Sequence, residues 1–86
     1  MKKAMTLKEC RTHIEKIKRV YSAINKEKFQ ITFGFPVEKC TVKLMTAAAR
    51  LLKEMSAERM RQPIMDLAKL ALQNAGKELQ VVTSEH

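Results

Sequence analysis

The sequence FQITFGFP, Phe29 to Pro36, decides the fold predicted for this chain. Large apolar residues alternate there with polar or small ones: Phe29, Ile31, Phe33 and Phe35 on one side, Gln30, Thr32 and Gly34 on the other. Such alternation is typical of a β-strand, because successive side chains point to opposite faces. A lone strand leaves its backbone N–H and C=O groups unpaired. We therefore predict that residues 29–36 pair with the same strand of a second chain, or with residues 79–83.

The residues before this strand, 1–28, are predicted to be a basic amphipathic helix. Thr6 can act as its N-cap, and Glu9 three residues later completes a capping box. Apolar residues then recur in steps of three and four, as on one side of a helix: Leu7, Cys10, Ile14, Ile17, Tyr21 and Ile24. This narrow apolar stripe is expected to pack on the core, while lysines and arginines cover the remaining surface.

The residues after the strand, 37–76, are predicted to form two or three helices. Pro36 ends the strand, Ser56 can cap a new helix, and Pro63 indicates a break near residues 61–63. Gly76 is the expected C-terminal stop, and residues 77–86 form a tail. The prediction is a single domain, 1–86, that is mainly α with one short strand in the order α–β–α–α. A small helical bundle with a minor β element is the alternative.

Positive charge is concentrated in the first third of the chain. The net charge is +8; residues 1–28 carry +6, residues 29–55 carry +2, and residues 56–86 balance at zero. Such asymmetry favours a polyanionic partner: DNA, RNA or an acidic protein surface. A solubilising surface is the simpler interpretation of the same pattern.

Residues suited to catalysis or metal binding are few. Asp66 is the single aspartate, and the two glycines cannot build a phosphate-binding loop. Cys10 and His13 have metal-ligand spacing, but no second close pair exists, and buried cysteine is the better interpretation. We expect no enzyme activity, no cofactor and no metal. Without an apolar segment of spanning length or an export signal, we also expect no membrane association and a cytoplasmic location.

The run QITFGFP, a helix after Pro36 and a second helix from Ser56 or Pro63 together resemble the ribbon-helix-helix repressors of phages and plasmids, Arc-like in type. The resemblance covers residues 29–76. It implies an intertwined homodimer whose paired strands enter the major groove of double-stranded DNA. In that arrangement Gln30 and Thr32 would contact base edges, and backbone amides near Ser56 would bind a phosphate.

A second geometry for DNA binding is a helix-turn-helix at residues 47–62, AAARLLKEMSAERMRQ. Ala48 would lie at the helix crossing, and Ser56 would cap the recognition helix. That helix would present Arg59, Arg61 and Gln62 to the bases.

These patterns together predict a small basic DNA-binding protein, a transcriptional regulator of bacterial, phage or plasmid type. The residues expected to contact phosphates are Lys16, Lys18, Arg19, Lys28 and Ser56. The alternative function is a non-enzymatic helical adaptor or inhibitor that uses its basic first helix to bind an acidic protein.

Overall fold

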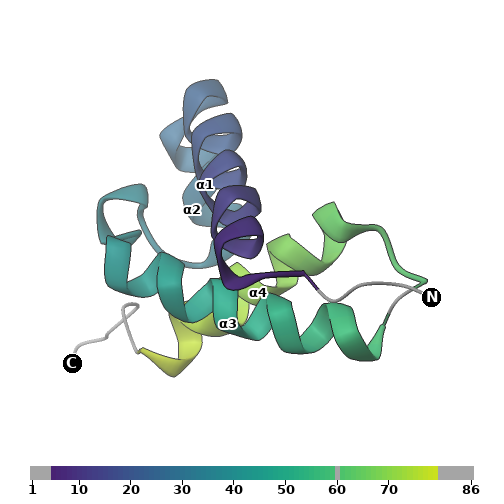
Figure 1. Cartoon of the computed structure of the whole chain (residues 1–86). Helices are drawn as coiled ribbons and strands as arrows, with labels where there is room; N and C mark the ends of the chain where they lie inside the picture. Colours follow the sequence, from purple (N-terminus) through teal and green to yellow (C-terminus); the bar gives the residue numbers. More distant parts are fainter. Residues whose placement is uncertain (1–4, 60, 80–86) are drawn as a thin grey trace.

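The computed structural model describes residues 5–59 and 61–79 of the chain. The described residues form four α-helices and one short 3-10 helix: α1 (Leu7–Ile24), α2 (Lys26–Phe33), η1 (Val37–Lys39), α3 (Val42–Glu58) and α4 (Ile64–Glu78). Helices α3 and α4 pack along each other as a pair, and α1 with α2 rises from this base (Figure 1). No helix among the described residues has the length and apolar character needed to cross a membrane.

The stretch predicted to be a strand is helix α2. Phe29 and Phe33 are four residues apart, so in a helix they share one side, and both are buried there. Ile31 lies on the opposite side and is 83% exposed. Gly34 ends the helix with φ 86°, and its N–H donates to the Gln30 carbonyl at 2.7 Å. The spacing that suggested alternation therefore also suits one helical turn.

The predicted ribbon-helix-helix fold is wrong, since residues 5–59 and 61–79 contain no β-strand. The intertwined dimer depended on strand pairing at residues 29–36, so that route to a dimer is lost as well. The structure is a small helical bundle, which was the alternative fold, and its described residues contain no minor β element. The other segment predicted to pair with residues 29–36 was residues 79–83. Its residues 80–83 lie outside the described part of the chain.

Helix α1 begins as the sequence predicts. The Thr6 hydroxyl accepts from the Glu9 backbone N–H at 3.1 Å, and the Glu9 carboxylate accepts from the Thr6 N–H at 2.9 Å. The helix predicted within residues 1–28 is interrupted at Asn25, whose side chain accepts from the Glu27 N–H at 2.7 Å and so caps α2. The chain turns at this single residue.

The ends of helices α3 and α4 confirm one boundary predicted from the sequence and contradict two others. Pro63 directly precedes α4, which confirms a break at residues 61–63. Ser56 does not cap a new helix, because it lies inside α3 and its hydroxyl donates to the Lys53 carbonyl. Gly76 does not stop α4, because the helix continues to Glu78. Gly76 instead lies against the ring of Phe35.

All helices contribute to one apolar core. Its fully buried large side chains are Phe29, Phe35, Ile14, Ile17, Leu44, Leu52, Leu72, Cys10 and Cys40. The rings of Phe29 and Phe35 meet edge to face at 5.6 Å, and Tyr21 packs on Phe33 at 5.2 Å. All three phenylalanines thus pack α2 and the following turn against the rest of the bundle.

Candidate nucleic-acid interface

One side of α1 carries a stripe of basic side chains. Lys8, Arg11, Glu15 and Lys18 are spaced i, i+3, i+7 and i+10, with Arg19 beside them. The buried residues of α1, Cys10, Ile14 and Ile17, occupy the inward side of the helix. The stripe therefore forms an outward flank, in which Glu15 is the only acidic residue.

Helix α3 carries a second stripe with the same spacing. Lys43, Thr46, Arg50 and Lys53 are spaced i, i+3, i+7 and i+10. The three basic side chains are exposed, and Thr46 is half-buried. Ala48 and Leu52 face the core on the other side of the helix. The stripe on α3 is thus a flank of three cations around one hydroxyl.

The two stripes meet at Arg11. Its Nη1 donates to the Thr46 hydroxyl at 3.1 Å, and its Nη2 lies 3.0 Å from a Glu15 carboxylate oxygen. Near the other end of α1, the Lys18 ammonium donates to the Cys40 carbonyl at 2.9 Å, just before α3 begins. These contacts hold both stripes at one junction, which we call the basic corner.

The basic corner comprises Lys8, Arg11, Lys18, Arg19, Lys43, Arg50 and Lys53, with Glu15 and Glu54 among them. Seven cations against two carboxylates give it a net charge of +5, out of +8 for the whole chain. Glu15 is itself paired with Arg11, and Glu54 lies one turn from Arg50 on α3. Such a concentration of one sign raises the local density of anions around it.

The basic corner includes two of the five side chains predicted to contact phosphates. Lys18 and Arg19 belong to it, but Lys16 lies further round α1, and Lys28 is on α2. Ser56 is part of the continuous helix α3, so its backbone amide is used within the helix and offers no phosphate-binding N-terminus. The cluster predicted from sequence is therefore split in space.

The two predicted base-reading residues do not share a face. Gln30 and Thr32 are two residues apart on α2, which places them about 200° apart around a helix. Gln30 is exposed, whereas Thr32 is half-buried and its carbonyl accepts from Gln73 at 2.7 Å. They cannot enter a groove together, as they would on a strand.

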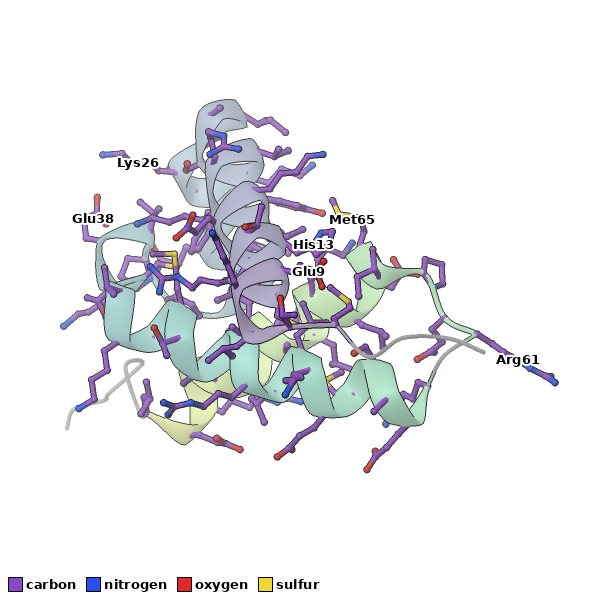
Figure 2. The ribbon with its side chains drawn as sticks, in the orientation of Figure 1. Glu9, His13, Lys26, Glu38, Arg61 and Met65 are labelled. Carbon is purple, nitrogen blue, oxygen red and sulfur yellow. The ribbon has the colours of Figure 1, made fainter. Side chains whose placement is uncertain are left out.

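The predicted helix-turn-helix is also absent from residues 47–59 and 61–62, the described part of residues 47–62. Helix α3 runs without a turn through Ser56 to Glu58, and no recognition helix begins there. Arg59, Arg61 and Gln62 lie in the connection between α3 and α4. Figure 2 shows Arg61 extending away from the helices at the tip of this connection.

Figure 2 also shows an ion pair outside the basic corner. Lys26 of α2 and Glu38 of η1 approach each other, with 3.3 Å between the ammonium and a carboxylate oxygen. A hydrogen bond from its own backbone and the Lys26 ammonium lower the pKa of Glu38.

The cysteines are placed as core residues. Burial raises the pKa of the Cys40 thiol to about 11, although Lys18 acts in the opposite direction. Burial and Glu9 likewise raise the pKa of Cys10. Both thiols are therefore held protonated at neutral pH, where they are poor nucleophiles and poor metal ligands. Within the described part of the chain, no three His, Cys, Asp or Glu side chains are grouped to hold a metal ion.

Sequence reasoning missed Lys8, Arg11, Lys43, Arg50 and Lys53. The signal was available, since the basic residues lie at i, i+3 and i+10 in the first segment and at i, i+7 and i+10 in the second, and these spacings share one flank of a helix. The meeting of the two flanks was not available, because it depends on how α1 packs on α3. The basic corner thus joins residues from two separate regions of the sequence. Comparison with family models, curated proteins and solved structures gives no match to this chain.

Proposed function

We propose that the protein binds double-stranded DNA through its phosphates, using the basic corner. The observation that carries this proposal is the junction of two cationic stripes, from α1 and α3, with a joint net charge of +5. Contacts to phosphates position a protein on DNA and carry no sequence information. The proposed activity is therefore binding with little sequence preference, without catalysis.

The size of the basic corner suits a DNA backbone. Lys8 and Arg19 are eleven residues apart on α1, which spans about 16 Å, and Lys43 and Lys53 span about 15 Å on α3. Along about 15 Å of the duplex axis, one strand carries roughly four phosphates. Each stripe thus has a length and a number of cations that match a short run of phosphates.

Aromatic side chains support a duplex over a single strand as the ligand. Proteins that bind single strands stack the bases on exposed aromatic rings. Here the three phenylalanines are buried, and Tyr21 packs edge-on against Phe33 while the Lys69 ammonium lies 5.8 Å from its ring centroid. The basic corner offers charge without a stacking platform.

The test is the variant Lys43→Gln, Arg50→Gln, Lys53→Gln. These side chains are exposed and make no hydrogen bond or ion pair with other described residues, so the fold should be retained. We expect affinity for a random duplex of about 20 base pairs to fall about tenfold or more, and the slope of log K against log salt to flatten by roughly two to three. Fluorescence anisotropy over a salt series measures both quantities.

The matched control is Arg59→Gln, Arg61→Gln, Lys77→Gln, which removes the same charge from exposed positions outside the basic corner. We expect a much smaller loss of affinity from it. An equal loss in both variants would show that net charge alone drives binding and would overturn the proposed interface. Failure of the unaltered protein to bind duplex at low salt would overturn the function itself.

The exposed side chains of Ile24 and Ile31 favour a second candidate function, which is binding of an acidic protein. Phosphate backbones offer nothing to aliphatic side chains, whereas protein partners do. This candidate corresponds to the adaptor alternative predicted from the sequence.

A further inference from the structure

Arg11 is held in place by contacts to both stripes of the basic corner. Its Nη1 donates to the Thr46 hydroxyl of α3 at 3.1 Å, and its Nη2 lies 3.0 Å from a carboxylate oxygen of Glu15 on α1. The three cations of α3 make no such contact with other described residues. A guanidinium that is already ordered loses less conformational entropy when it binds an anion.

The guanidinium of Arg11 is also partly removed from water. Its side chain is 30% exposed, and its Nε is buried with no hydrogen-bond acceptor among the described residues. A cation in such a place is attracted to an anion more strongly than a fully hydrated one, because the local dielectric is lower. Order and partial burial together favour Arg11 over the exposed cations as the anchor for one phosphate.

Glu15 occupies the position that an anion would take on Arg11. A carboxylate and a phosphate both accept from the N–H groups of a guanidinium in the same forked geometry. The Glu15 side chain is 45% exposed, so it can turn away into solvent. Ion pairs of this kind on a helix surface contribute little to stability, and the order here, with the cation four residues before the anion, is the weaker one. A phosphate can therefore replace the carboxylate.

We propose that Arg11 anchors one backbone phosphate of the duplex and that Glu15 competes with this phosphate for the same Nη2 atom. The inference rests on the proposed function and deepens it, because it names a central contact and an autoinhibitory group within the site. Glu15 lowers the affinity for DNA, and it does so through Arg11. A carboxylate that acted only through its charge would lower the affinity whatever residue stood at position 11.

Glu54 is a matched control, because it repeats the local pattern of Glu15 without the ion pair. It follows Arg50 by four residues on α3, as Glu15 follows Arg11 on α1. Glu54 is exposed and makes no ion pair with another described residue. Glu15→Gln and Glu54→Gln remove the same charge from the basic corner, but only the first releases a side chain that is held at the junction.

The test measures affinity for a random duplex of about 20 base pairs by fluorescence anisotropy at fixed salt. We expect Glu15→Gln to tighten binding about tenfold, because the carboxylate both repels the phosphate and occupies its partner, and Glu54→Gln to tighten it about two- to threefold. In the Arg11→Gln background, Glu15→Gln should tighten binding no more than Glu54→Gln does in the original chain.

Circular dichroism checks that each variant is folded. If Arg11→Gln is unfolded, Arg11→Lys replaces it in the cycle, and the same loss of the extra gain is expected because lysine lacks the forked geometry. The comparison of Glu15→Gln with Glu54→Gln needs no change at Arg11 and stands in either case.

Equal gains from the two glutamate variants, or an extra gain from Glu15→Gln that persists without Arg11, would overturn the inference and leave DNA binding intact. Absence of duplex binding by the unaltered protein at low salt would overturn the proposed function and this inference with it. The two failures are distinguishable, because the first is seen only in a protein that binds DNA.

Discussion

Gly76 is a residue at which α4 packs closely against the ring of Phe35. A Cβ atom at this position would lie 2.6 Å from Cε1 and 2.7 Å from Cδ1 of Phe35. Phe35 is fully buried and packs on Phe29, so its ring has little room to move. The absence of a side chain at Gly76 is therefore what allows α4 to approach the turn after α2.

Gly76→Ala should lower the free energy of unfolding by about 1–3 kcal/mol, which is the usual cost of overpacking a core. Helix propensity alone would favour alanine by about 1 kcal/mol, so the two effects have opposite sign. Urea denaturation measures the difference. Lys77→Ala, at the exposed neighbouring position, should change stability by no more than about 0.5 kcal/mol. A variant with alanine at 76 that is as stable as the original would contradict the close packing.

Cys40 should make stability depend on pH in the alkaline range. Burial raises the pKa of its thiol to about 11 from the usual 9.0. Between these values the unfolded chain loses the thiol proton while the folded chain keeps it, so the free energy of unfolding falls as pH rises. Below pH 9 this contribution is fully present.

The measurement is urea denaturation from pH 8 to 11, with Cys40→Ala as the comparison. That variant is less stable at every pH, because it loses buried volume. It should lose less further stability between pH 9 and 11, since only Cys10 still has a raised pKa. Parallel pH curves for the two proteins would show that Cys40 does not make this contribution.

At the scale of elements, sequence patterns place α1 and the break before α4 correctly. The capping box at Thr6 and Glu9 and the break at Pro63 depend on local chemistry, which the sequence contains. The error at residues 29–36 has a physical cause, because a spacing of four residues between Phe29 and Phe33 suits a helix as well as a strand. Only a strand would place Ile31 on the same buried side as Phe29 and Phe33. Whether Ile31 is buried depends on tertiary packing, which the sequence pattern does not show.

Helix α2 depends on a hydrogen bond from α4. The Gln73 amide donates to the Thr32 carbonyl at 2.7 Å, in the last turn of α2 where carbonyls have no partner within the helix. Gln73→Ala should cost about 0.5–1.5 kcal/mol and reduce hydrogen-exchange protection in α2 more than in α1. Asn74→Ala is the neighbouring control. Equal loss of protection in both helices would indicate a global effect instead.

For the whole molecule, the charges of the basic corner repel one another across the α1–α3 junction. The net charge of the sequence predicted a polyanionic partner. The charges summed over each third of the chain could not show that the basic stripes of α1 and α3 meet in the fold. The meeting is a property of packing, through contacts such as Arg11 to Thr46. Repulsion among these charges lowers the stability of the folded state, and this effect can be measured.

Raising the salt concentration from about 10 mM to 200 mM should therefore stabilise the fold, by about 0.5–1 kcal/mol, because salt screens exposed charges beyond about 10 Å. Thermal unfolding over a salt series measures this. Arg50→Glu should flatten the dependence, while Arg61→Glu, in the α3–α4 connection, should change it less. Stability that falls with added salt would mean that attractive pairs outweigh the repulsion.

The single residue Asn25 that separates α1 from α2 could serve as the hinge for domain swapping between two chains. The Asn25 N–H already donates to the Tyr21 carbonyl, and its own carbonyl accepts from Phe29, so a change of backbone angle at this one residue would merge α1 and α2. Asn25→Ala removes the cap and favours the merged helix. That helix would carry Phe29 and Phe33 out of their own core and into the vacated core of a neighbouring chain. We expect a domain-swapped dimer, which light scattering at high protein concentration would detect in the variant in greater proportion than in the original chain.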